Sequence, residues 1–317
     1  MNALPPADRA IDLAMASASE SKNYIRSRWI QEINRRRVGH DSGVLYVTLC
    51  GAHGLDISAL IDAGVIGLTE NDSIAAADAG LVVAYEKNMP AVAAVKRKFP
   101  GLKVVESDIH EKLRVGALFA SPSREDKQIF RAPVINLDYD GNVRIQDGKS
   151  PFVEAAVRLA EFHASDMKSW SLLITANASI SWDEDGQKWA KSFLSQYLEE
   201  ELVLSQKVQS DVRFLAEDCD LRQVDFDVQQ YIVSIFLPLR LADDLVSRHW
   251  LVSPSSVFVY SGGGGAPMVS WILSIDHDPS APANRLRLLK QLPQTLMACV
   301  EDLRESGGAD GSDVAER

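Results

Sequence analysis

Cysteine is scarce in this sequence, and its placement excludes two kinds of site. Only three cysteines are present, Cys50, Cys219 and Cys299, and no two of them form a C-x-x-C pair. An odd number of widely spaced cysteines offers neither a disulfide framework nor a zinc-binding pattern. We therefore expect reduced thiols, and no metal site is predicted.

Long hydrophobic runs are also missing. No segment approaches the roughly 20 consecutive apolar residues that a membrane-spanning helix needs, although the hydrophobic share of 46% is ordinary for a soluble globular protein. The first residues lack the basic start and the apolar stretch of a secretory signal, reading MNALPPADRAID. These features predict a cytoplasmic protein.

The chain does not have the overall positive charge of a protein that binds nucleic acid over its whole surface, because its formal net charge is −11. A local exception lies between residues 22 and 37, where six basic side chains accompany one acid, Glu32. Ile25, Trp29 and Ile33 recur there at the spacing of one helix face, so the segment is predicted to be helical. The basic residues lie mostly off that face and are either solvated or able to contact the phosphates of RNA or DNA: Lys22, Arg26, Arg28, Arg35, Arg36 and Arg37.

From residue 43 onward, predicted strands alternate with predicted helices. Short apolar runs bounded by turn residues predict five strands, at residues 44–49, 81–86, 102–108, 133–138 and 170–176. Alternation at this spacing is typical of a mostly parallel sheet with right-handed crossovers. Two later runs flank the glycine-rich segment from Tyr260 to Ala266, which predicts an antiparallel hairpin at the end of the sheet.

Chemically informative residues follow the predicted strands. Gly51 and Gly54 come after the first strand, where glycine lets the backbone approach a ligand and the start of a helix offers unpaired N–H donors. Acids follow the next two strands, at Glu86 and Asp108. The fourth strand ends in the polar sequence INLDYDGN, at the edge where open α/β sheets bind their ligands.

This order of features resembles the class I S-adenosylmethionine-dependent methyltransferases, over roughly residues 43–278. The resemblance implies that Gly51 and Gly54 form the cofactor loop for S-adenosylmethionine. It also implies that Glu86 accepts the ribose hydroxyls and that Asp108, with Ile109 beside it, meets the adenine. The function implied is methyl transfer to a nitrogen or an oxygen.

The end of the fourth strand is where the resemblance implies the methyl acceptor, with Asn136, Asp138 and Tyr139 as the residues that orient it. LDYDG is similar to the acid-x-aromatic-x-glycine arrangement of tRNA guanosine dimethyltransferases but lacks their proline after the acid. The Asn/Asp-Pro-Pro-Tyr of DNA amino-methyltransferases is absent, and the fifth strand has no lysine for the Lys-Asp-Lys-Glu tetrad of ribosomal RNA 2′-O-methyltransferases. The subfamily stays open, and the basic helix makes a nucleic acid our first choice of acceptor.

The predicted fold class is α/β: a Rossmann-like three-layer sandwich with a mostly parallel seven-stranded sheet and an antiparallel C-terminal β-hairpin. The expected organisation has four parts: an N-terminal helical arm with the basic patch (1–42), the Rossmann-like methyltransferase domain with a helical insertion at 183–250 (43–278), a C-terminal helix (279–304) and a disordered polar tail (305–317).

Alternatives remain for the ribose-binding acid and for the function. A plain βαβ unit places its ribose-binding acid about 20 residues after the glycine loop, and Glu70 or Asp72 lies nearer to that spacing. If Glu86 is the ribose-binding acid, residues 56–80 are an insertion. A non-catalytic Rossmann-like interaction protein, or a methyltransferase for a small molecule or a protein, is the alternative function. A nicotinamide-dependent enzyme is disfavoured because G-x-x-G is not G-x-G-x-x-G.

Overall fold

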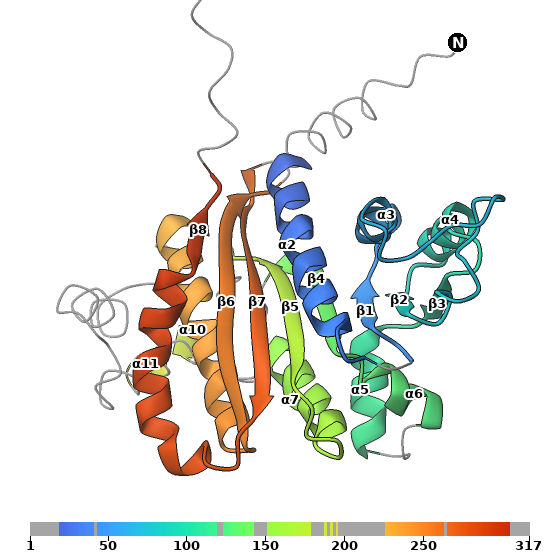
Figure 1. Cartoon of the computed structure of the whole chain (residues 1–317). Helices are drawn as coiled ribbons and strands as arrows, with labels where there is room; N and C mark the ends of the chain where they lie inside the picture. The colour runs from blue at the N-terminus through green and yellow to red at the C-terminus, as the bar shows by residue number, and fades with distance from the viewer. Residues whose placement is uncertain are drawn as a thin grey trace, which may run out of the picture.

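A single mixed β-sheet forms the middle layer of the molecule (Figure 1). The computed structural model describes residues 19–40, 43–118, 123–142, 151–178, 187–188, 191–192, 195, 226–262 and 265–304. The strand order is β3-β2-β1-β4-β5-β7-β6-β8. The strands are β1 (Tyr46–Leu49), β2 (Val82–Glu86), β3 (Lys103–Glu106), β4 (Val134–Asn142), β5 (Trp170–Asn177), β6 (Trp250–Ser261), β7 (Pro267–His277) and β8 (Val300–Asp302).

The pairing of the strands confirms the predicted sheet. β1 to β5 are parallel to one another, and β7 runs antiparallel to both β5 and β6. The sheet has one strand more than predicted, because β8 pairs in parallel with β6. β8 has only three residues, two of them acids, so it carries no alternating pattern that a sequence reading could detect.

Helices cover both faces of the sheet, which confirms the three-layer sandwich. One buried cluster joins the sheet to three helices on the first face, α2 (Ser19–Arg37), α3 (Leu55–Asp62) and α4 (Met89–Lys98). A second cluster joins it to five helices on the other face: α5 (Ile109–Leu118), α6 (Arg124–Ile129), α7 (Pro151–His163), α10 (Phe226–Val246) and α11 (Arg285–Ala298), which follows the short 3-10 turn η2 (Pro282–Asn284). None of the described helices is long and apolar enough to cross a membrane.

Helix α2 lies flat on the sheet and is fixed there by both apolar and polar contacts. Ile25, Trp29 and Ile33 are buried, as the helical spacing predicts. Because the helix runs opposite to the strands, its last turns lie over the start of β5, and its first turns lie over the carboxyl end of β4, where Lys22 meets Asp138. The basic segment is therefore part of the packed sandwich.

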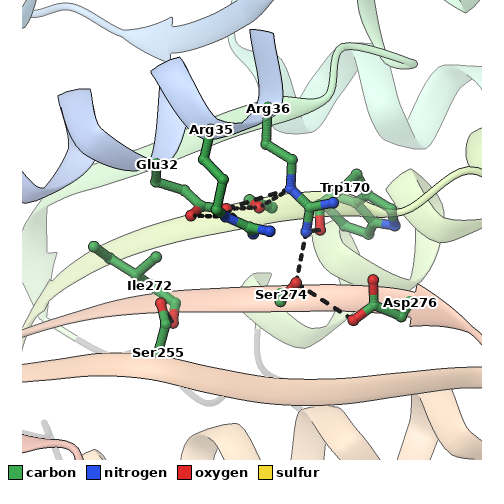
Figure 2. A network of polar contacts seen from close by, with 9 residues as sticks. Glu32, Arg35, Arg36, Trp170, Ser255, Ile272, Ser274 and Asp276 are labelled. Carbon is green, nitrogen blue, oxygen red and sulfur yellow. Dashed lines mark hydrogen bonds and ion pairs between the residues drawn. The ribbon is translucent and has the colours of Figure 1, made fainter. Parts of the chain in front are cut away.

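A buried polar network holds the last turns of α2 (Figure 2). The Arg36 guanidinium donates to the hydroxyl of Ser171 (2.8 Å), the carbonyl of Trp170 (3.1 Å) and the hydroxyl of Ser274 (2.5 Å). The carboxylate of Glu32 accepts from Arg36 at 3.3 Å and also from the Ser171 hydroxyl. This network ties α2 to the two central strands β5 and β7.

The path from α3 to β2 is long but contains no second helix among the described residues. After α3 ends, turns follow, with one isolated bridge between Leu68 and Ile74. Val65, Ile66 and Ile74 are buried against the α2 face. Of the predicted helical insertion, α10 occupies 226–246. Most of the rest of 183–250, and the whole tail from residue 305, lie outside the described residues.

Candidate functional site

Four of the predicted site residues lie at the carboxyl ends of four adjacent strands. Asp108 follows β3, Glu86 ends β2, Gly51 follows β1, and Asp138, within β4, is level with the residue that follows β1. Adjacent strands are about 4.8 Å apart, so these positions follow one another along a single edge. β1 and β4 lie where successive strands turn to opposite sides of the sheet, the switch point at which open α/β sheets bind ligands.

The structure also distinguishes between the acids that were candidates for the same position. Glu86 pairs in register with Glu106 of β3 and so lies at the strand end. Glu70 and Asp72 are exposed residues of the turn near the Leu68–Ile74 bridge, away from any strand end. Glu86 is therefore the acid that stands next to the glycine loop.

The two glycines of the loop have different local requirements. Both have left-handed backbones, with φ of 56° at Gly51 and 52° at Gly54. A Cβ on Gly54 would lie 2.6 Å from Cε2 of Phe99, whereas a Cβ on Gly51 would have no atom within 4 Å. Gly54 is thus required by packing beneath α4, and Gly51 borders open space at the switch point.

Alanine substitutions are expected to separate these two requirements. Gly51→Ala should lower the free energy of unfolding by about 1 to 2 kcal/mol, the cost of a left-handed non-glycine residue. Gly54→Ala should cost about 1 kcal/mol more, because Phe99 must move as well. Urea denaturation of both variants measures the difference. Equal losses would contradict the packing role given to Gly54.

Glu86 lies close to the glycine loop and helps to start α4. Its Oε1 accepts from the backbone N–H of Asn88 at 2.8 Å, and the Asn88 side chain in turn caps α4. The pKa of the Cys50 thiol, just before Gly51, shows that the carboxylate of Glu86 is close to the loop. Burial first, and then the charges of Asp56 and Glu86, raise the pKa of Cys50 to about 12.

Asp108 already has a structural function in the fold. It caps α5 by accepting from the backbone N–H of His110 at 2.8 Å, and its other oxygen accepts from Nζ of Lys87 at 3.0 Å. Burial alone would raise the pKa of Asp108, but these two bonds outweigh it and hold the pKa below its ordinary value. The side chain of Ile109 is buried in the core, so only its main chain, in the first turn of α5, can face a ligand.

The three residues predicted to orient an acceptor are divided between the two faces of β4. Successive residues of a strand point to opposite faces, and β4 follows this rule. Asn136 and Asp138 face α2, where Asp138 forms an ion pair with Lys22. Tyr139 faces the other layer, where its hydroxyl bonds to Nε2 of His110 and its ring meets Phe152 edge-on at 4.5 Å.

A buried polar cluster beneath α2 was not predicted from the sequence. Asp56, in the first turn of α3, accepts from the hydroxyls of Thr48 and Tyr46, and Tyr46 accepts from Nδ2 of Asn136 at 2.7 Å. Burial raises the pKa of Asp56 to about 6; the Thr48 bond opposes this shift and the charge of Asp138 adds to it. The available signal was the presence of Thr48 and Asn136 at paired positions in otherwise apolar strands.

The amide of Asn136 is incompletely bonded although the residue is fully buried. Its Oδ1 has no hydrogen-bond partner. Turning the amide over would exchange the two atoms, so one polar atom of this side chain lacks a partner in either orientation. Such an atom costs free energy unless a further group meets it. It lies one strand from the glycine loop.

Each of the six basic residues of α2 has a polar partner within this chain, and for Arg26 and Arg35 that partner lies in α2 itself. Besides the contacts of Arg36 and Lys22 given above, the described partners are Asn23 for Arg26, Ser256 and Glu301 for Arg28, Glu32 for Arg35, and the Val65 carbonyl for Arg37. Their charge is thus partly neutralised within the fold. Within the described residues, no group of His, Cys, Asp or Glu side chains could hold a metal ion.

Comparison with known proteins gives matches among solved structures alone: no protein-family model and no curated protein sequence matches the chain. The structure of the plantazolicin methyltransferase BpumL in complex with SAH is 11% identical, with a TM-score of 0.35, over 86% of this chain and 91% of that chain. Complexes of the same enzyme with SAH and a pentazolic or a triazolic desmethylPZN analog are 10% identical, with TM-scores of 0.33 and 0.34, over 85% of this chain and 91% of theirs. The Rossmann-like α/β fold of the present chain follows from its own strand order, with β7 reversed between β5 and β6.

Proposed function

We propose that this protein is an S-adenosylmethionine-dependent methyltransferase. The observation that carries the proposal is the series of strand ends along one edge of the sheet: Asp108, Glu86, Gly51 and Asp138, on β3, β2, β1 and β4. A nucleoside with an amino-acid tail needs hydrogen-bond acceptors for its base and its ribose, a close approach to the backbone, and charged partners for the tail. The series offers these in that order.

The residues present fit such a cofactor. Gly51 borders open space and has the backbone geometry that glycine allows. Glu86 places a carboxylate beside the loop, where ribose hydroxyls can donate to it. S-adenosylmethionine brings a methyl group that its sulfonium already activates. The protein therefore has to bind the cofactor, align the acceptor and keep water out.

The methyl acceptor is proposed to be a nitrogen or an oxygen, approached from the end of β4. Of the three residues predicted for this role, Tyr139 offers a hydroxyl held by His110, whereas the Asn136 amide is fully buried on the opposite face of β4. A nucleic acid as acceptor remains a prediction from the basic composition of α2. The contacts made by those side chains weaken the basis for it, since four of the six charges are already paired with acids of this chain.

SAH binding tests the proposal most directly. SAH, the demethylated product of the cofactor, should raise the melting temperature of the purified protein, as any ligand specific for the folded state must. Glu86→Ala should weaken SAH binding by about 10- to 100-fold, because a hydrogen bond to a charged group contributes about 1.5 to 3 kcal/mol. Isothermal titration calorimetry measures both affinities.

Glu106→Ala is the matched control, since Glu106 is the acid at the end of the next strand and forms an exposed ion pair with Lys96. This variant should bind SAH as the wild type does. Absence of a thermal shift at millimolar SAH in the wild type would refute the proposal.

Transfer itself needs a second assay. The protein should transfer the radiolabelled methyl group of S-adenosylmethionine to a component of RNA, DNA, peptide or small-molecule fractions of a cell extract. Binding of SAH together with no transfer to any fraction would favour the non-catalytic interaction protein. Label in the nucleic acid fraction, removed by nuclease, would support the acceptor predicted from the sequence.

A further inference from the structure

An ion pair between α2 and β4 lies on the face of the sheet that α2 covers. Nζ of Lys22, from the first turn of α2, lies 2.9 and 3.1 Å from the two carboxylate oxygens of Asp138. The two side chains are only 17% and 19% exposed. The same ammonium lies 6.0 Å from the ring centroid of Tyr260 on β6. The pair is thus enclosed by three elements.

Lys22 is held in place by a helix that cannot shift independently. The Arg36 network fixes the far end of α2, and Trp29 is buried between the two ends. One turn beyond Lys22, Arg26 has a buried Nε with no hydrogen-bond partner. Two cations on one face of the helix therefore lie at the carboxyl edge of the sheet, and one of them has unused hydrogen-bonding capacity.

We infer that the Lys22–Asp138 pair binds the amino-acid end of the cofactor, with Asp138 accepting from its ammonium and Lys22, assisted by Arg26, donating to its carboxylate. This inference rests on the proposed function. It assigns Asp138 to the cofactor, where the sequence had predicted a contact with the acceptor, and it makes α2 a wall of the cofactor site.

The physical argument is an exchange of partners. An amino-acid end carries both an ammonium and a carboxylate, and the Lys22–Asp138 pair carries the complementary charges. When the two pairs exchange partners, none of the four charges is left unpaired in a partly buried place, which would be costly. A ligand with one of the two charges, or with neither, gains no such exchange. The subsite therefore selects for a zwitterion.

The position of the pair agrees with the order of the other strand ends. Asp138 is one strand from Gly51, two from Glu86 and three from Asp108, which is about 14 Å from the last. An extended cofactor with its base at Asp108 would place its ribose at Glu86 and its tail at β4. The charge of Asp138 also reaches Asp56 beneath the loop, where it contributes to the raised pKa.

Two nucleosides that differ in the amino-acid end test the inference. SAH has this end, and methylthioadenosine lacks it. Lys22→Met and Asp138→Asn should each weaken SAH binding by about 10- to 100-fold, and should change methylthioadenosine binding by less than about twofold. Lys22→Arg, which keeps the charge, should recover most of the SAH affinity. Lys96→Met, which breaks an exposed ion pair on α4, is the matched control and should change neither.

The ratio of the two affinities within each variant is the deciding quantity, because a general disturbance of the fold would change both ligands together. Equal losses for SAH and methylthioadenosine, or no loss for either, would overturn the inference while leaving the proposed function intact. A wild-type protein that binds neither nucleoside would instead refute the proposed function.

Discussion

Arg36→Met is expected to lower the free energy of unfolding by about 3 to 5 kcal/mol, because it removes one partner from a buried charged network. The side chains of Arg36 and Glu32 are only 11% and 8% exposed. Without the guanidinium, Glu32 keeps a buried negative charge with fewer donors. The hydroxyl of Ser274 and the carbonyl of Trp170 lose a donor as well. Urea denaturation followed by circular dichroism measures the loss.

The adjacent arginine provides the control. Arg35 donates two hydrogen bonds to the same carboxylate, at 2.7 and 2.5 Å, but its side chain is 55% exposed. Arg35→Met should therefore cost less than Arg36→Met, about 1 to 2 kcal/mol, because water can replace the exposed guanidinium beside Glu32. A larger loss of unfolding free energy for Arg35→Met than for Arg36→Met would contradict the conclusion that Arg36 is the residue that fixes α2 to the sheet.

The stability of the wild type relative to Asp56→Asn is expected to fall by about 2 kcal/mol between pH 4 and pH 7. The pKa of Asp56 is about 6 in the folded chain, raised mainly by burial, against an ordinary value of 3.8. Between these two values the unfolded chain has released the proton while the folded chain retains it. Stability must therefore decrease as the pH rises through this window. The full difference is about 1.4 kcal/mol for each unit of difference in pKa, and most of it, about 2 kcal/mol, lies between pH 4 and pH 7.

Other groups change stability in the same range, so the comparison with Asp56→Asn at each pH is essential. His163 acts in the opposite sense, because burial lowers its pKa to about 3 and its neutral form is favoured in the folded chain. This effect is common to both proteins and cancels. Chemical denaturation at pH 4, 5, 6 and 7 gives the difference. A difference that does not change with pH would contradict the titration assigned to Asp56.

Much of the fold could be predicted because each strand of the parallel sheet is recognisable from its own short stretch of sequence. The apolar runs before Gly51 and Glu86 bury both of their faces in a parallel sheet, so they read as continuous hydrophobic segments. The choice of Glu86 over Glu70 also depended on strand quality, and the position of Glu86 at the end of β2 agrees with it. β8 and the buried network of α2 depend on pairings with distant strands that no local pattern encodes.

The candidate site was less predictable, for two different reasons. The divergence of Asp138 and Tyr139 follows from the alternation of side chains along a strand, so the sequence did contain that information. The partner of Asp138 could not be found in this way. Lys22 lies 116 residues earlier, in a segment whose charge suggested binding to phosphate. What decided its contact was how α2 docks, which depends on apolar packing at Trp29 and on the Arg36 network.

That docking has a consequence for how the chain is made. The hydroxyl of Ser274 that anchors Arg36 is 238 residues downstream, which corresponds to roughly 10 to 50 s of synthesis. During this interval α2 has left the ribosome, but the strand that completes its binding face does not yet exist. The apolar stripe of α2 therefore stays in solvent or on a chaperone, and the earliest helix of the described residues to be synthesised is among the last to pack in its final place.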